Sequence, residues 1–188
     1  MEVLEAIKTR RSIRKYKSTP VDDKTLEQIL EAAQWAPSWA NTQCWRFVVV
    51  GEPAKKAELA DTLKGSRPES TNPATDAIKN APLVIVACAQ KKRSGHYHGE
   101  PSTDKGDGWL MFDVGLAMQN LVLAAHALGL GTVHVGAFDA KKVENILGVP
   151  EEYCVVEMTP LGHPDQEANA PPRKELSEIV FHEKFPAA

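Results

Sequence analysis

WLMFDVGLAMQNLVLAAHAL, residues 109–128, is the stretch that decides the fold. Its apolar side chains fall on nearly every side of a helix, whereas a helix at a protein surface keeps one polar face. Gly129 and Gly131 follow directly and are typical of a helix end, since glycine readily adopts the left-handed backbone conformation found there. The stretch therefore predicts a buried central helix around which the rest of the chain packs.

Three apolar runs rich in β-branched residues predict strands beside that helix. They are WRFVVVG at 45–51, APLVIVACA at 81–89 and YCVVEMTPLG at 153–162. Continuous runs of this length are typical of strands that are buried on both faces. GTVHVGAF at 131–138 is a fourth strand candidate, with more polar residues.

Apolar residues at helical spacing predict two amphipathic helices at the start of the chain. The first carries Val3, Leu4 and Ile7 on one face, and the second ends at Pro37 after the face Leu26, Ile29, Leu30 and Ala33. Two amphipathic helices, each with one apolar face, are therefore expected to open the chain.

The remaining segments complete an α+β pattern. Residues 53–63 and 140–147 are typical of surface helices, while 64–75 and 90–108 show no clear period. Helices and strands thus interleave irregularly, which predicts a mixed sheet covered by helices. The chain has 188 residues, no internal repeat and no linker, so we expect one domain over residues 1–188.

The composition is that of a globular protein, with 43% hydrophobic residues, 25% charged residues and a formal net charge of −3. No uninterrupted apolar run reaches the roughly 20 residues of a membrane span, and the start lacks the apolar core of a secretory signal. We therefore expect a cytoplasmic protein with no membrane partner. Cys44, Cys88 and Cys154 are odd in number and far apart, which favours buried thiols over disulfides or a metal site.

Positive charge gathers at the N-terminus, although the chain as a whole is acidic. The first 20 residues hold six Lys or Arg against two Asp or Glu, and the densest stretch is KTRRSIRKY at 8–16. The forked donors of Arg10, Arg11 and Arg14, with the hydroxyl of Ser12, match the oxygens of a phosphate group. A solvated charged face, a nucleic-acid surface and a membrane-surface patch are the alternatives for such a run.

A second basic element, PPRKEL at 171–176, supports the phosphate interpretation. Arg173 and Lys174 lie beside an expected helix start, and helix N-termini attract anions. The two basic clusters can converge on one anion. A pI of about 6.1, and the lack of basic residues interleaved with aromatic ones elsewhere, argue against a nucleic-acid partner.

APSWANTQCW, residues 36–45, offers dense hydrogen-bonding capacity between a helix and a strand. It contains the polar residues Ser38, Asn41, Thr42 and Gln43 and the tryptophans Trp39 and Trp45. Such amides and hydroxyls can satisfy a sugar-alcohol chain or the polar edge of a heteroaromatic ring, while the tryptophans supply apolar contact. A polar turn whose tryptophans enter the core is the alternative.

Five motifs in this order resemble the FMN-dependent nitroreductase family essentially end to end. They are RRSIRKY, APSWANTQCWRFVVV, DVGLAMQNLVLAAHALGLGT, PLGHP and PRKELSEIV. The resemblance implies a nitroreductase-like α+β fold, with a central, mostly antiparallel mixed sheet, in a tightly intertwined homodimer. It implies tightly but non-covalently bound FMN at each of two subunit interfaces. The implied activity is hydride transfer from NADH or NADPH to FMN, then to a small-molecule acceptor such as a nitroaromatic or a quinone, in a ping-pong mechanism.

The same resemblance assigns cofactor-binding residues by position. The N-terminal motif that grips the phosphate and the ring's polar edge corresponds to Arg10, Arg11, Ser12 and Arg14, and the C-terminal phosphate arginine to Arg173. The segment that reaches the flavin across the dimer interface corresponds to Pro37, Ser38, Trp39, Asn41 and Gln43. A strand that passes near the ring, acting through backbone groups, corresponds to His134, Val135 and Gly136. No catalytic side chain and no metal are expected, because the cofactor carries the chemistry.

Two positions depart from the pattern of the family. Cys44 stands where a proline is common, which predicts a local backbone difference. His134 stands where a tryptophan or a small residue is common, which predicts altered access to one side of the ring.

Two alternative functions stay open beside the main hypothesis. One is a specialised reductive enzyme of the same family, of the dehalogenase or flavin-cleaving type, and the other is a non-catalytic flavin- or haem-type binding module.

The remaining polar residues have a structural interpretation by default. His96 and His98 resemble a metal pair, but no cysteine or carboxylate motif accompanies them, so a substrate lid or a plain surface loop is the better interpretation. Asp113 is interpreted as a hydrogen-bonded buried or interface carboxylate and not as an acid catalyst, and His126 as a packing residue. The absence of Ser-His-Asp, P-loop and GxGxxG patterns argues against an independent dinucleotide domain.

Overall fold

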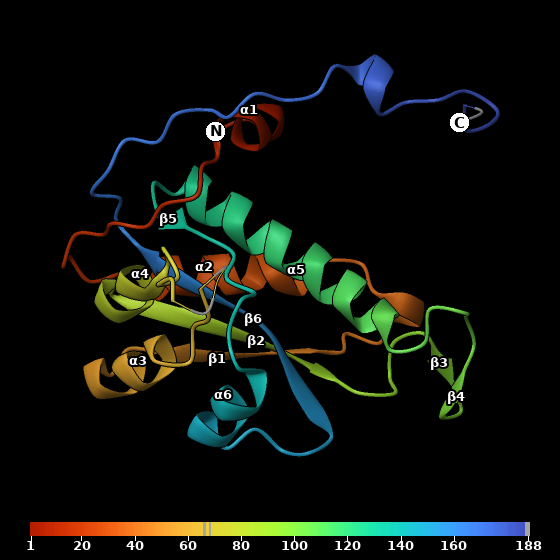
Figure 1. Ribbon diagram of the computed structural model, residues 1–188, viewed down its shortest axis with the longest axis horizontal. Coiled ribbons are helices and arrows are strands. Elements are labelled where there is room, and N and C mark those ends of the chain that lie inside the picture. The colour runs from red at the N-terminus through yellow and green to blue at the C-terminus, as the bar shows by residue number, and fades with distance from the viewer. Residues whose placement is uncertain (66, 68, 187–188) are drawn as a thin grey trace.

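The computed structural model describes residues 1–65, 67 and 69–186, and it confirms the predicted α+β architecture (Figure 1). The helices are α1 (Val3–Thr9), α2 (Asp23–Gln34), α3 (Pro53–Ala60), α4 (Thr75–Asn80), α5 (Gly108–Ala127) and α6 (Ala140–Leu147), with short 3₁₀ turns at Trp39–Asn41 and Leu176–Glu178. The strands are β1 (Trp45–Val50), β2 (Leu83–Gln90), β3 (His96–Tyr97), β4 (Glu100–Pro101), β5 (Gly131–Thr132) and β6 (Tyr153–Gly162).

Helix α5 lies against one face of the sheet, next to α2, as Figure 1 shows. Its buried side, which includes Val114, Met118 and Leu121, belongs to one apolar cluster with α2 and the sheet. Met111 and Phe112 on its other side remain 52% and 56% exposed. The predicted burial is therefore confirmed for the inner side only. By length and composition α5 could also cross a membrane, a test that core helices pass as well.

The main sheet has the strand order β1-β2-β6-β5, and each neighbouring pair is antiparallel. Ile85 and Ala87 of β2 pack with α2 and α5, whereas Val84 and Val86 pack in a second cluster with α3, α4 and α6. Strand β2 is thus buried on both faces, as its unbroken apolar sequence predicts. The fold has three layers, with helices on either side of the sheet (Figure 1).

The fourth strand is much shorter than the predicted 131–138. After Thr132 the chain meets β6 again only at Val135, whose backbone N–H and C=O groups both bond to Met158 at 3.0 Å. Phe138 is buried beside α6 and bridges to Leu63, which draws the chain away from the sheet edge. The alternating pattern therefore produces an irregular segment at 133–137, in which His134, Gly136 and Ala137 are exposed and Val135 is buried, instead of a continuous ladder.

Three local features were not predicted or were predicted with wrong limits. Helix α3 ends at Ala60, before the predicted end at residue 63. Helix α4 buries only Ala77 and Ile78, too few residues for a periodic signal. The β3–β4 hairpin lies in the stretch 90–108, where each strand has two residues.

Residues 10–17 run along the sheet edge beside β5. The Ile13 N–H donates to the Thr132 carbonyl at 2.8 Å, in a parallel bridge between Ser12 and Thr132. Farther along, the Lys17 N–H donates to the His163 carbonyl at 2.9 Å. The basic N-terminal segment is therefore held against the body of the protein by backbone bonds.

Gly131 allows this close approach, and its replacement tests the docking of the N-terminal segment. A Cβ atom at position 131 would lie 2.8 Å from the Cβ of Ile13. We expect Gly131→Ala to lower the free energy of unfolding by about 1 to 3 kcal/mol, as overpacking does, in urea denaturation. Gly108→Ala, where an added Cβ meets nothing within 4 Å, is the matched control and is expected to cause no loss. Equal stability of the two variants would contradict this account of residue 131.

Candidate functional site

Three arginines from the two ends of the chain gather beside the C-terminus of α1. The pKa of Arg10 lies below its ordinary value, because the residue is partly buried and because Arg11 and Arg173 place positive charge near it. Among the described residues, no salt bridge involves Arg10, Arg11, Arg14 or Arg173. The structure therefore brings Arg173 to the N-terminal cluster, and the cluster has cationic donors left for an anion.

A hollow of about 170 Å³ adjoins this cluster and is lined by Arg10, Arg11, His126 and Thr132, among others. His126 Nε2 lies 2.8 Å from Thr9 Oγ1, and the Thr9 hydroxyl donates to the Glu5 carbonyl at 2.7 Å. The imidazole is thus the donor to Thr9. Burial lowers the pKa of His126, and the charges of Arg10 and Arg11 lower it further. His126, interpreted from sequence as a packing residue, is part of the basic site.

A second hollow, of about 130 Å³, joins Arg14 to the turn after β5. Its lining includes the predicted residues His134, Val135 and Gly136, so the structure brings these to Arg14. Gly136 faces open space, since an added Cβ would meet nothing within 4 Å. A planar ligand could therefore approach the backbone of the turn closely.

Asn72 also lines this second hollow, and sequence reasoning missed it. Its Nδ2 donates to the carbonyls of Lys64 and Ala137, at 3.0 and 3.2 Å, so the side chain braces the turn that carries Gly136. The only signal available was the Asn-Pro pair at residues 72–73, which marks a turn but no ligand.

His134 is paired with a carboxylate. Its Nδ1 lies 2.9 and 3.0 Å from the two carboxylate oxygens of Glu157, which also accepts from the Thr159 hydroxyl at 3.0 Å. The side chain of Glu157 is largely buried, whereas that of His134 is exposed. The departure from the family pattern at His134 thus places a hydrogen-bonded polar pair beside the turn.

The predicted loop 37–43 forms a separate surface. Ala40, Asn41 and Gln43 all have positive φ angles, and the Gln43 N–H donates to Ser38 Oγ at 2.9 Å. The ring of Trp39 meets the ring of Trp109 edge-on, with centroids 5.0 Å apart. A hollow of about 480 Å³ is lined by Trp35, Pro37, Asn41 and Gln43, among others.

This loop and the arginine cluster lie at opposite ends of α5. The Trp39 N–H donates to Asp113 near the start of the helix, whereas Thr9 contacts His126 near its end. The two contacts are 13 residues apart, which is about 20 Å along a helix axis. Within one chain the two halves of the predicted cofactor site therefore do not meet.

Two other predictions concern metals and thiols. In the described part of the chain, no group of three or more His, Cys, Asp or Glu could hold a metal ion. His96 is instead bonded through Nδ1 to the Ser94 carbonyl, at 3.0 Å. Cys44, Cys88 and Cys154 are free thiols, the first two buried and the third half-buried.

Comparison with known proteins identifies the family. Residues 7–163 match the model of the nitroreductase family. The chain belongs to the nitroreductase family. The resemblance based on five short motifs is thereby confirmed.

Relatives of this chain carry several names. It is 36% identical over 168 residues to a protein of Methanothermobacter thermautotrophicus named for NADH dehydrogenase and NAD(P)H nitroreductase activity, with 87% of this chain and 78% of the relative covered. It is 31% identical over 193 residues to 5,6-dimethylbenzimidazole synthase of Rhodospirillum rubrum, with 94% and 87% covered. The NADPH:FMN oxidoreductase of Vibrio harveyi, solved with NAD+, matches at a TM-score of 0.84 and 29% identity, over 99% of this chain and 79% of that one.

The charge of the arginine cluster can be measured through His126. Because Arg10 disfavours the protonated imidazole, we expect Arg10→Gln to raise the pKa of His126, although burial, the larger cause, keeps it below the ordinary value. Inorganic phosphate bound at the cluster is expected to raise it in the wild type. An NMR pH titration of the imidazole resonances measures both effects. Lys15→Gln is the control with the same change of charge, and a pKa equally insensitive to Arg10→Gln and to phosphate would contradict this description of the hollow.

Proposed function

We propose that this nitroreductase is an FMN-dependent NAD(P)H oxidoreductase and that its cofactor site is built around Arg10, Arg11 and Arg173. The observation that carries the proposal is the cluster of cationic donors, which form no salt bridge with any carboxylate among the described residues. It adjoins a turn whose backbone is open to a planar ligand. Both features fit a group that has a phosphate at one end and a flat ring at the other.

Each part of FMN, the phosphate and the ring, has matching groups among these residues. The arginine cluster and Ser12 would hold the phosphate, as forked donors do. Arg14 would lie toward the polar edge of the ring, and the backbone at His134, Val135 and Gly136 would pass beside it. The chemistry that FMN supplies when bound is hydride transfer, from NADH or NADPH and then to a small-molecule acceptor such as a nitroaromatic or a quinone.

The protein would contribute orientation and electrostatics to this chemistry. The fixed backbone bonds of Ile13 and Lys17 keep the basic segment in place before any ligand arrives, so little reorganisation is needed on binding. The charge of Arg14 would favour negative charge that develops at the near edge of the ring. No side chain has to act as a general acid, and two half-reactions at one site give ping-pong kinetics.

A second copy of the chain would complete the site. Since loop 37–43 lies about 20 Å along α5 from the arginine cluster, we infer that Pro37, Ser38, Trp39, Asn41 and Gln43 contact the flavin held by the other subunit of a homodimer. Exposed apolar residues support this arrangement. They include Met111 and Phe112 on α5 and Val3, Leu4 and Ile7 on α1.

The C-terminal tail supplies a second argument for the dimer. Residues 171–186 are exposed throughout, and beyond α1 they extend away from the body of the protein (Figure 1). The tail nevertheless carries large apolar side chains, namely Leu176, Ile179, Val180, Phe181 and Phe185. An exposed series of this kind marks a protein interaction surface.

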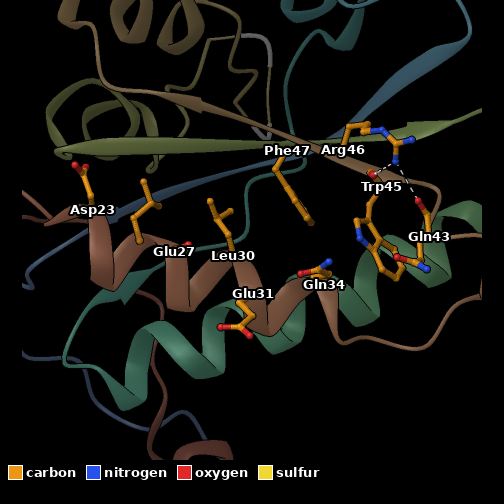
Figure 2. Close-up of a pocket in the computed structure, with 10 residues that line it drawn as sticks. Asp23, Glu27, Leu30, Glu31, Gln34, Gln43, Trp45, Arg46 and Phe47 are labelled. Carbon is orange, nitrogen blue, oxygen red and sulfur yellow. Dashed lines mark hydrogen bonds between the residues drawn. The ribbon is translucent and has the colours of Figure 1, made fainter.

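A groove on the body matches this tail in chemistry. It has a volume of about 790 Å³ and lies between α2 and the edge strand β1 (Figure 2). Its lining combines the apolar Leu26, Leu30 and Phe47 with the acidic Asp23, Glu27 and Glu31. The tail combines apolar and aromatic residues with the basic Lys174, His182 and Lys184 and the acidic Glu175, Glu178 and Glu183, so the match lies in the apolar side chains. We therefore propose that each tail wraps the partner subunit at this groove. A cytoplasmic location agrees with this proposal and stays a prediction.

The cofactor proposal is tested by the absorption spectrum of the purified protein and by stopped-flow reduction with NADH and NADPH. We expect a flavin spectrum and parallel double-reciprocal lines with an acceptor. Loss of one charge-assisted interaction, worth about 1.5 to 3 kcal/mol, predicts that Arg10→Ala or Arg173→Ala weakens FMN binding about 10- to 150-fold.

Lys15→Ala is the matched control, because it removes the same charge from an exposed neighbour, and its FMN affinity is expected to stay unchanged. A colourless protein with no measurable FMN affinity would end the proposal. Bound FMN without turnover of either nicotinamide would favour the non-catalytic binding module.

The role of the tail is tested by Phe181→Ser combined with Phe185→Ser. Burial of each phenylalanine is worth about 1.5 to 3 kcal/mol, so we expect the dimer dissociation constant to rise at least 100-fold in sedimentation equilibrium. FMN should be lost together with the dimer, because ligand binding and association are linked. Glu183→Ser is the control in the same tail. A monomer that keeps full FMN affinity would refute the shared site.

A further inference from the structure

Asp113 is a buried acid that the proposed function does not use. Its side chain is 1% exposed and lies in the first half of α5, among apolar neighbours. Its Oδ2 atom accepts from the Trp39 N–H at 3.0 Å and from Ser94 Oγ at 2.5 Å. The Cys44 thiol is a third, weak donor at 3.9 Å. One oxygen atom of α5 thus joins two other segments, the one that contains Trp39 and Cys44 and the one at Ser94.

The loop bonded to Asp113 needs an external anchor. Ala40, Asn41 and Gln43 have φ angles of 44°, 53° and 46°, and a non-glycine residue in this region costs on the order of 1 kcal/mol or more. Such a backbone persists only where surrounding contacts determine it. The bond from the Trp39 N–H to Asp113 fixes the loop at its first turn, where the ring of Trp39 also packs on Trp109 of α5.

The hydrogen bonding of Asp113 is not the arrangement that would give the greatest stability. Asp113 Oδ1 is buried without a hydrogen-bond partner, and among the described residues only Thr42 Oγ1, in the same loop, shares this condition. An unpaired buried acceptor lowers stability, and apolar residues of similar volume often replace buried charges without loss. Burial and the charge of Asp113 raise the pKa of Cys44 to about 12, so this thiol stays protonated and able to donate.

Ser94 connects a further segment to the same carboxylate. Ser94 is fully buried. It lies at the start of the segment that contains the β3–β4 hairpin and leads to α5. Its hydroxyl is the closest donor to Asp113. A shift of the carboxylate would therefore be transmitted to loop 38–43 and to residues 94–107 together.

We propose that Asp113 is the positioning residue of the cofactor site: it holds loop 38–43 in the shape that completes the flavin site of the second subunit, and through Ser94 it ties residues 94–107 to that loop. The inference rests on the proposed function, because it assigns the loop to the partner's flavin. Asp113 touches no reacting atom in this account.

The test compares Asp113→Ala and Asp113→Asn with Asn120→Ala in the flavin-loaded dimer. Asn120 is the matched control, since its Nδ2 ties the same helix to the Ala32 carbonyl at 3.2 Å without contact to the loop. Hydrogen exchange of the peptide covering residues 38–43 is the first measurement, and FMN affinity with separate kcat and KM values for the acceptor is the second.

We expect Asp113→Ala to raise the exchange rate in loop 38–43 at least tenfold and to weaken FMN binding about 10- to 100-fold. Asp113→Asn, which keeps one acceptor oxygen and the side-chain shape, is expected to fold and to show an intermediate effect. Ser94→Ala is expected to raise exchange in residues 94–107 more than in loop 38–43. In each case the pKa of His126, at the other end of α5, should stay at its wild-type value.

Two outcomes separate this inference from the proposed function. If both Asp113 variants match Asn120→Ala in loop exchange and in FMN affinity, Asp113 is a packing residue and the inference is wrong. If the wild type binds no FMN, the proposed function fails, and the inference fails with it as a statement about the flavin. Greater loop exchange in Asp113→Asn would then still show that the carboxylate positions residues 38–43.

Discussion

Helix α5 has no continuous polar side to present to water, and the other elements are arranged around that constraint. The sheet and α2 cover its inner side, which joins the largest apolar cluster of the protein. On its outer side, Met111 and Phe112 stay more than half exposed to solvent in the described part of the chain. Because an exposed apolar strip of this kind is unfavourable in water, the same helix that organises the subunit also favours association with a second one.

The helix also separates the two halves of the candidate site. The arginine cluster lies beside its C-terminal end and the strained loop beside its N-terminal end. A two-fold axis beside α5 would bring the end of one helix near the start of the other. Dimerisation and cofactor binding would then depend on the same surface, so a subunit alone would leave the outer side of α5 exposed and the site incomplete.

The sequence predicted the elements with strong patterns and missed those that tertiary contacts decide. The unbroken apolar runs located β1, β2 and β6. The predicted burial on both faces is confirmed for β2, whereas the edge strand β1 leaves Arg46 and Val49 exposed. The stretch 131–138 alternates like a strand, but the burial of Phe138 under α6 ends the ladder after Thr132. For the site, the motifs of the family supplied Arg10, Arg14 and Gly136. They did not supply Asn72 or His126, which join the site through folding and have no local signature.

The protonation state of the three cysteines affects how easily the protein is modified by electrophiles. Burial raises the pKa of Cys44 to about 12 and that of Cys88 to about 11, and it raises the pKa of Cys154 as well. Thiolates, not thiols, attack electrophiles, so at neutral pH each cysteine is held in its unreactive form. Quinones and partly reduced nitroaromatics are electrophiles that form covalent adducts with exposed thiolates. A protein that turns over such compounds, and carries its thiols in this state, would be protected from inactivation by its own substrates and products.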